Sequence, residues 1–243
     1  ALILLAGFEW LALLRLSKLA QVLFLTALGA LSGLGVYTMA HGLGQASVQA
    51  LVMKTTLQTA QWVWLLVVPL WLGLQPRFPK LVQQGLLALI GIVVLASAGF
   101  WLMVWQDNRA ILLTLVATVC VADSVAYFGG QRFGRHALAP SLSPKKTWEG
   151  LLGALLAVSI LAFAWAFLTD VTTGMPLVLC AWLVVYLSVI GDLFESFLKR
   201  QAAVKDSGQL LPGHGGILDR IDGWLPVLAF SPLLALAVEM LQS

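Results

Sequence analysis

Seven long apolar runs restrict what this sequence can fold into. They cover approximately residues 19–40, 57–74, 81–105, 110–130, 151–168, 176–198 and 223–241. An α-helix of about 20 apolar residues crosses the hydrocarbon core of a bilayer, whereas membrane β-strands alternate polar and apolar residues. These runs show no such alternation, and only 10% of all residues are charged, against about 25% in soluble domains. The sequence therefore predicts an all-α, polytopic transmembrane helical bundle with seven full spans.

A shorter apolar run covers residues 1–14, which are too few to cross a bilayer. Because the chain starts at Ala1 without a methionine, we expect this run to be the truncated remnant of a longer helix. No internal repeat and no low-complexity segment interrupts the sequence. We predict a single membrane domain over residues 1–243.

Basic residues divide unequally between the two sides of the membrane if successive spans alternate in direction. One side receives only Lys54 and Arg109. The other side receives Arg15, Lys18, Arg77, Lys80, Arg132, Arg135, Lys145, Lys146, Lys199, Arg200, Lys205 and Arg220. Loops rich in Lys and Arg face the cytoplasm in membrane proteins. The bias predicts which loops are cytoplasmic, and it accounts for the net charge of +3 without a nucleic-acid partner.

Acidic residues inside the apolar runs need an explanation, because each costs about 2.5–3.5 kcal/mol at the centre of a span. Asp192, Glu195 and Lys199 are spaced by three and four residues, which places them on one helix face. Such a polar face predicts a cavity beside the helix. For Asp123, in another run, and for Glu195, hydrogen bonding between helices is the alternative explanation.

A second acidic pair begins the last apolar run. Asp219 and Asp222 are three residues apart, on one face if a helix has begun there, while Arg220 points to a different side. Carboxylates on two helix ends can converge on one ion. Mg²⁺ prefers a few carboxylates together with water and substrate phosphates. The pattern therefore predicts a magnesium site between two helix ends.

Cations and glycines lie between these acidic groups. Lys and Arg side chains bind phosphate, and glycine-rich turns can direct several backbone N–H groups at one anion. The residues concerned are Lys199, Arg200, Lys205, Gly208, Gly213, Gly215 and Gly216. They predict a polyphosphate substrate. His214, in the same turn, could act as a general base, ligate a metal or fix the loop by a hydrogen bond.

Another cytoplasmic segment, residues 141–150, holds Ser143, Lys145, Lys146 and Glu149 just before a span. The two lysines could serve only as interfacial anchors for the next helix. Because the segment lies on the same side of the membrane as the first cluster, we predict that it forms a second phosphate clamp.

The motifs resemble those of the phosphatidate cytidylyltransferases, also called CDP-diacylglycerol synthases. The signature residues are Ser196, Lys199, Arg200, Lys205, Asp206, Gly208, Leu211, Pro212, His214, Gly215, Gly216, Asp219, Arg220 and Asp222. Supporting segments are the ADSVAYFGG sequence around Asp123, residues 143–150, residues 191–196, and the early dipeptide of Glu9 and Trp10. The resemblance covers about 60 residues of the C-terminal half.

The resemblance implies that CTP and phosphatidate react to give CDP-diacylglycerol and pyrophosphate, with Mg²⁺ as cofactor and K⁺ as a candidate second cation. Residues 1–105 would be N-terminal helices, and residues 106–243 would be the catalytic helices and cytoplasmic loops. It further implies a homodimer in the bacterial cytoplasmic (inner) membrane, in contact with membrane lipid, with the active site facing the cytoplasm.

Roles for individual residues follow from the resemblance as hypotheses. The metal ligands would be Asp192 and Asp219, with Asp222 and Asp123 as further ligands. The catalytic set would be Asp192, Lys199, Asp219, Arg220 and Asp222. Substrate binding would fall to Ser143, Lys145, Lys146, Glu149, Ser196, Arg200, Lys205, Asp206, His214, Gly215 and Gly216. Ser143, Lys145 and Lys146 would hold either the lipid phosphate or the nucleotide.

Two other functions are considered. A CDP-alcohol phosphotransferase would need the pattern D-G-x2-A-R-x8-G-x3-D-x3-D, which the sequence lacks. An ion-coupled transporter would use Asp123, Asp192 and Glu195 near the midplane. Against a transporter, these residues lie toward one end of their runs, and no inverted repeat is visible.

Overall fold

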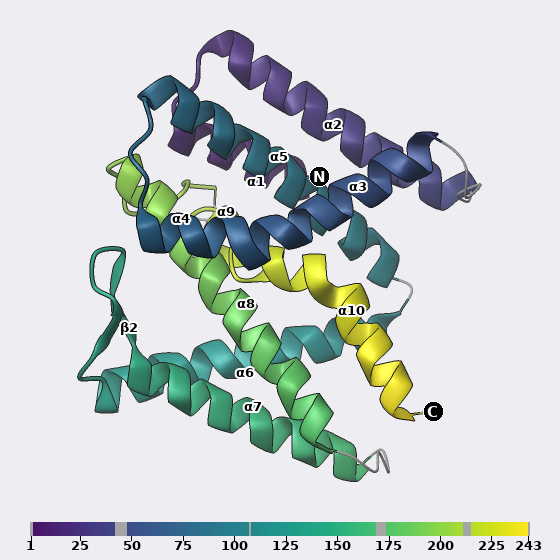
Figure 1. The fold of residues 1–243 in the computed structure, drawn as a ribbon, viewed down its shortest axis with the longest axis vertical. Coiled ribbons are helices and arrows are strands. Elements are labelled where there is room, and N and C mark those ends of the chain that lie inside the picture. The colour runs from purple at the N-terminus through teal and green to yellow at the C-terminus, as the bar shows by residue number, and fades with distance from the viewer. Residues whose placement is uncertain (1, 42–47, 107, 169–173, 211–214, 243) are drawn as a thin grey trace. The chain divides into compact units, whose positions relative to one another are not determined.

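The computed structural model describes residues 2–41, 48–106, 108–168, 174–210 and 215–242 (Figure 1). In chain order, the elements of these residues are α1 (Leu2–Leu14), α2 (Lys18–His41), α3 (Val48–Trp62), the π-helical turn η1 (Val63–Val67), α4 (Val68–Leu74), α5 (Lys80–Trp105), α6 (Arg109–Phe133), β1 (Ala137–Ala139), β2 (Ser143–Thr147), α7 (Trp148–Leu168), α8 (Gly174–Gln201), α9 (Leu218–Ile221) and α10 (Trp224–Gln242).

Seven segments of the described chain are long and apolar enough to cross a membrane, and α1 is a shorter apolar helix. The prediction of an all-α, polytopic bundle with seven spans is therefore confirmed, as is the short helix at the N-terminus. The spans are Lys18–Ala40, Val48–Leu74, Lys80–Trp105, Arg109–Phe133, Trp148–Leu168, Gly174–Gln201 and Leu218–Ala237.

The second span begins at Val48 rather than near residue 57, because its polar residues are accommodated within the helix. The hydroxyls of Thr55 and Thr56 donate to backbone carbonyls one turn earlier. Further along, Pro69 follows the π-helical turn, in which Val68 N donates to Val63 O. Proline has no N–H for the helix ladder, and the wider turn before it lets α3, η1 and α4 continue as one span of 27 residues.

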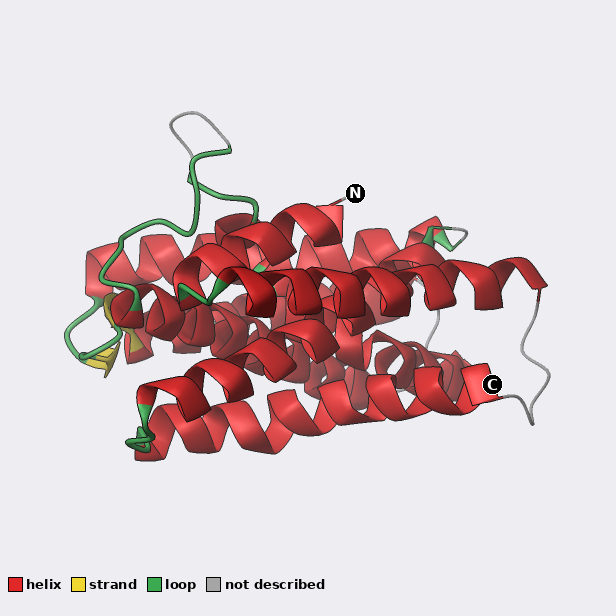
Figure 2. Ribbon diagram, turned by 90° about the horizontal axis from the view of Figure 1, so that it is seen from above, coloured by secondary structure: helices red, strands yellow, loops and turns green. Residues whose placement is uncertain are grey.

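The short hairpin of β1 and β2, between α6 and α7, was not predicted (Figure 2). Its strands pair antiparallel, with Ala137 opposite Thr147. Its base is closed by a hydrogen bond of 3.0 Å from Trp148 N to His136 O. The Thr147 hydroxyl accepts from Gly150 N at 3.2 Å and caps the start of α7. The hairpin thus carries the segment that holds Lys145 and Lys146.

The chain forms two compact units. The first comprises residues 1–107 and 190–229, and the second comprises residues 108–189 and 230–243. The core of the first unit is aromatic: the ring of Phe194 lies 6.0 Å from that of Trp10 and 5.8 Å from that of Trp64. Trp10 Nε1 also donates to Leu87 O at 3.1 Å. These contacts hold α1, α5, η1 and the C-terminal part of α8 together.

The second unit packs through small and β-branched residues. Ala122 of α6, Ala154 and Val158 of α7, and Val185 of α8 form one buried cluster. Short side chains let transmembrane helices approach closely. The hairpin is therefore attached to a tightly packed base.

Candidate active site

Two acidic side chains from different elements meet in the first unit. The carboxyl of Asp222, which lies between α9 and α10, is within hydrogen-bonding reach of the carboxyl of Asp192 on α8. Asp222 is 9% exposed, and its Oδ1 accepts from Gly223 N at 2.8 Å. Gly191 makes the approach possible, because a Cβ at this position would overlap the backbone carbonyl of Asp222. The two carboxylates therefore converge as predicted, but Asp192 lies nine residues before the end of α8 and not at a helix end.

Lys199 lies between two more carboxylates. It forms an ion pair with Glu195, one turn earlier on α8, and its Nζ lies 2.7 Å from Asp219 Oδ1. The first contact confirms that Glu195 and Lys199 share a helix face. The Glu195 side chain is only 4% exposed, and its Oε1 makes no hydrogen bond with any residue that the structure describes. A buried oxygen of this kind is available to another ligand.

Asp219 binds backbone as well as lysine. Its Oδ2 accepts from Gly216 N at 2.8 Å, from Ser207 N at 2.9 Å and from Ser207 Oγ at 2.9 Å. Gly215 has a φ of +82°, and a Cβ there would lie 2.7 Å from Asp219 Oδ2. Glycine alone adopts this backbone conformation readily. Both Asp219 oxygens thus have partners, one in the turn and one on α8.

Glu9 of α1 takes part in the same network, although the sequence indicates it only as part of the early dipeptide with Trp10. Its Oε1 accepts from Ile217 N at 3.0 Å, and its Oε2 accepts from Leu218 N at 2.7 Å. Ser207 Oγ lies 3.3 Å from Oε2. Glu9 is the only charged residue among residues 1–14, and a lone charge in an apolar run is the sequence signal that could have identified it as a functional residue. Ser207 gave no signal, because nothing in the sequence distinguishes it from other loop serines.

The remaining predicted residues of this unit lie around the network. Ser196 is half-buried on α8, and Gly216 is buried in the turn. Arg200, Lys205, Asp206 and Arg220 are exposed. His214 lies outside the described residues. The structure thus brings Asp192, Lys199, Asp219 and Asp222 together in two adjoining contacts and leaves further cations at the surface.

In the second unit, the hairpin carries the other predicted phosphate ligands. Ser143 begins β2, Lys145 is exposed and Lys146 is half-buried. Glu149 at the start of α7 accepts at Oε2 from the backbone N–H groups of Arg135 and His136, at 3.1 Å and 3.3 Å. Its Oε1 lies 2.6 Å from His136 Nδ1. Glu149 therefore fixes the base of the hairpin.

Asp123 belongs to the second unit too. It is exposed on α6, and Ser188 Oγ donates to its Oδ1 at 3.4 Å. The hydrogen bond joins α6 to the part of α8 that belongs to this unit. Hydrogen bonding between helices, which is the alternative explanation for Asp123, is therefore observed.

The acidic residues fit a magnesium ion that is bound partly by the protein and partly by a substrate. In the described parts of the chain, no three His, Cys, Asp or Glu side chains gather to hold a metal ion. Asp192 and Asp222 supply two carboxylates side by side. In nucleotide sites, Mg²⁺ usually takes one or two protein carboxylates and completes its shell with water and phosphate oxygens. The pair has the right chemistry for that arrangement, and not for a closed protein cage.

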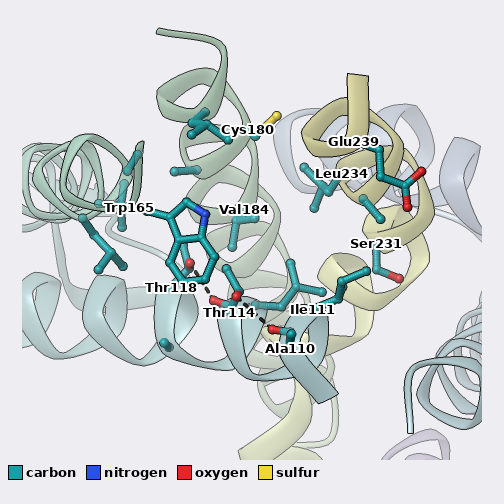
Figure 3. Close-up of a pocket in the computed structure, with 18 of the residues that line it drawn as sticks. Ala110, Ile111, Thr114, Thr118, Trp165, Cys180, Val184, Ser231, Leu234 and Glu239 are labelled. Atoms are coloured by element: carbon teal, nitrogen blue, oxygen red, sulfur yellow. Dashed lines mark hydrogen bonds between the residues drawn. The ribbon is translucent and has the colours of Figure 1, made fainter. Parts of the chain in front are cut away.

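A separate, apolar pocket of about 460 Å³ lies in the second unit (Figure 3). The labelled side chains of Figure 3 come from α6, α7, α8 and α10. The hydroxyls of Thr114 and Thr118 donate to carbonyls one turn earlier on α6, at 2.9 Å and 2.8 Å. Their hydrogens are therefore not offered to a ligand. None of the predicted site residues that the structure describes lines this pocket, so it is distinct from the acidic network.

Comparison with known proteins agrees with these motifs. A sequence model described as "Cytidylyltransferase family" matches residues 1–238. A Haemophilus influenzae protein named phosphatidate cytidylyltransferase is 45% identical over 127 residues, which cover 49% of this chain and 43% of that protein. A Thermotoga maritima protein of the same name is 41% identical over 159 residues, covering 63% of this chain and 58% of that protein.

A third protein with this name, from Brucella abortus, is 34% identical over 210 residues, which cover 73% of this chain and 75% of that protein. The chain spans about half the length of the Haemophilus and Thermotoga relatives that it matches. The match to the family extends over both compact units. The chain belongs to the cytidylyltransferase family.

Proposed function

We propose that this protein transfers the cytidylyl group of CTP to phosphatidate, giving CDP-diacylglycerol and pyrophosphate in phospholipid biosynthesis. One structural observation carries the proposal: buried Asp222 lies against Asp192, on the helix whose next turns hold Glu195 and Lys199. Paired carboxylates beside a lysine suit a polyphosphate bound with a divalent cation. The names of the relatives from Haemophilus, Thermotoga and Brucella supply the substrates.

The lipid phosphate is its own nucleophile in this reaction. The second pKa of a phosphate monoester is about 6, so phosphatidate is largely dianionic at neutral pH and needs no protein base. One of its oxygens forms a bond to the α-phosphorus of CTP, and the bond from that phosphorus to the bridging oxygen of the β-phosphate breaks. Pyrophosphate leaves with the electron pair. The protein's task is to hold two polyanions in line against their repulsion.

The cations of the first unit would perform that task. Lys199 contacts Asp219 by a flexible ammonium group, which can turn toward a phosphate without disturbing the bonds of Asp219 Oδ2. Arg200, Lys205 and Arg220 are exposed and would bind the triphosphate and the leaving pyrophosphate. We also assign Ser196, Asp206, His214, Gly215 and Gly216 to substrate binding.

Magnesium would be held by Asp192 and Asp222 with Asp219, and by Asp123 as a further ligand, with K⁺ as the second cation. When bound, Mg²⁺ would supply positive charge that offsets the negative charge of the phosphate oxygens. The orphaned Oε1 of Glu195 adds an acceptor beside this set.

Ser143, Lys145 and Lys146 would hold the lipid phosphate or the nucleotide, on a hairpin that Glu149 fixes. The distribution of Lys and Arg supports an orientation with the hairpin and residues 199–222 in the cytoplasm. Phosphatidate would then enter sideways from the bilayer, and CTP from the cytoplasm. We further propose one membrane domain that acts as a homodimer in the bacterial inner membrane.

A direct assay tests the reaction. Purified protein in detergent, given radiolabelled CTP and phosphatidate with Mg²⁺ and K⁺, is expected to form a lipid-soluble nucleotide and an equal amount of pyrophosphate. Consumption of CDP-diacylglycerol with an alcohol would indicate a CDP-alcohol phosphotransferase instead. Ion-driven uptake into proteoliposomes without a nucleotide product would indicate a transporter. Either outcome, or no product at any Mg²⁺ or K⁺ concentration, would overturn the proposal.

A further inference from the structure

We propose that Glu9 is a positioning residue, which clamps the turn of Ser207 and residues 215–218 in the form that binds CTP. The inference rests on the proposed function only for the identity of the nucleotide. The clamp itself is a contact between the N-terminal helix α1 and a turn about 200 positions later.

The carboxylate of Glu9 pairs two backbone N–H groups at the start of the last span, where Ile217 is half-buried and Leu218 is fully buried. It receives the N–H groups of Ile217 and Leu218, and Glu9 itself is only 5% exposed. Buried backbone donors are almost always paired, because an unpaired one loses its hydrogen bonds to water without compensation. The start of the last span therefore depends on a side chain from α1.

Ser207 connects this clamp to the lysine network. Its hydroxyl lies 3.3 Å from Glu9 Oε2 and 2.9 Å from Asp219 Oδ2. A hydroxyl donates one hydrogen at a time, so Ser207 bridges two carboxylates without satisfying both at once. Asp219 in turn contacts Lys199. The contacts of Glu9 thus reach Lys199 through two intermediates, Ser207 and Asp219.

Close packing makes the clamp specific. A Cβ at Gly208 or at Gly216 would overlap the carboxylate of Glu9. The helix that carries Glu9 is held from two sides, since Trp10 Nε1 donates to Leu87 O at 3.1 Å and Arg15 donates to Ala202 O at 2.8 Å. Because α1 is fixed by these other bonds, removal of the Glu9 charge should release the turn while α1 stays in place.

The test compares Glu9→Gln with wild type and with Glu239→Gln, a matched change at an exposed glutamate outside the network. The first readout is tryptic cleavage after exposed Lys205 in the full-length, detergent-solubilised protein. Loss of charged hydrogen bonds should raise the open population, so we expect Glu9→Gln to be cleaved about tenfold faster or more. Glu239→Gln should be cleaved at the wild-type rate.

The second readout is kinetic. If the clamp selects a CTP-competent form, a smaller competent fraction raises the apparent dissociation constant by the same factor. The KM for CTP should rise about tenfold in Glu9→Gln, while kcat at saturating CTP and the KM for phosphatidate change by less than about threefold. A purely folding defect would instead lower kcat with both KM values unchanged, and would overturn the positioning role.

A weaker variant covers the case in which Glu9→Gln does not fold. Ser207→Ala removes the bridging hydroxyl but keeps the Glu9 carboxylate, and should raise both cleavage after Lys205 and the KM for CTP about threefold. Wild-type cleavage rates in Glu9→Gln, or in Ser207→Ala if only that variant folds, would refute the clamp. Because proteolysis needs no turnover, this result is independent of the assay for the proposed reaction, whose failure would show in the wild type.

Discussion

Two carboxylates in this protein are used in the same way but in different surroundings. Asp219 accepts from two backbone N–H groups and contacts Lys199. Glu149 also accepts from two backbone N–H groups and contacts His136. The side chains of Asp219 and Lys199 are 12% and 17% exposed, whereas those of Glu149 and His136 are 25% and 76% exposed.

The two ion pairs differ in whether water and salt can replace the contact between their partners. Water and salt readily substitute for an exposed ion pair, which is therefore weak. A buried carboxylate and ammonium have no such substitute, so loss of one leaves the other uncompensated. Asp219 and Lys199 should therefore be far less tolerant of substitution than Glu149 and His136, although both turns are built alike.

The largest effect is expected for Asp219→Asn. The amide cannot accept from the turn and from Lys199 as the carboxylate does, so both contacts weaken. If Asp219 also directs charge at the triphosphate, kcat should fall about 100- to 1,000-fold, as when one preorganised electrostatic contact is lost. Radiolabelled CTP turnover measures this, with Glu239→Gln as control. Turnover within about threefold of wild type would remove Asp219 from the site.

A smaller but diagnostic effect is expected for Lys199→Met. The substitution leaves Glu195 as a buried carboxylate without its cation, and stripping one partner from a buried pair costs about 3–5 kcal/mol. Since Lys199 is 17% exposed, we expect the lower end. Adding Glu195→Gln should recover most of the thermal stability in detergent but not the turnover. If the double variant regains activity, Lys199 has only a structural role.

The sequence predicted the parts of this comparison that depend on local spacing. Apolar length alone predicted the number of spans, because each must cross the bilayer, but it placed the start of the second span nine residues too late. The i,i+4 spacing placed Glu195 and Lys199 together. The contact between Asp192 and Asp222 was anticipated only as a convergence of two helix ends, since nothing local determines how two helices approach.

Contacts between distant segments could not be predicted. Glu9 meets Ile217 and Leu218 only because α1 packs beside the turn, and no periodicity links such positions. The hairpin was missed for another reason: β1 has three residues, too few for a strand pattern. The charge of Glu149 is visible in the sequence and predicts a substrate ligand, which stays a prediction. Its contacts with the backbone of Arg135 and His136 could not be predicted.

On the hairpin, the double substitution Lys145→Gln with Lys146→Gln should act on binding. Exposed phosphate contacts contribute to binding in the ground state and the transition state alike, so KM should rise while kcat changes little. We expect about a tenfold rise in the KM for one substrate, larger at low salt because exposed charges are screened. The affected substrate identifies the phosphate that the hairpin holds. Unchanged KM values would leave the two lysines as membrane anchors.

The smallest effect is expected for Glu149→Gln. The amide oxygen can still accept from the backbone N–H of Arg135 or His136, and the lost charge faces a histidine that is 76% exposed. Turnover should fall by less than about threefold. His136→Gln should have a similar effect, and the double variant should add nothing, because both changes remove one contact. Additive or larger losses would mean that Glu149 contacts the substrate directly. The difference between Glu149 and Asp219 would then come from what each carboxylate binds, and not from how deeply it is buried.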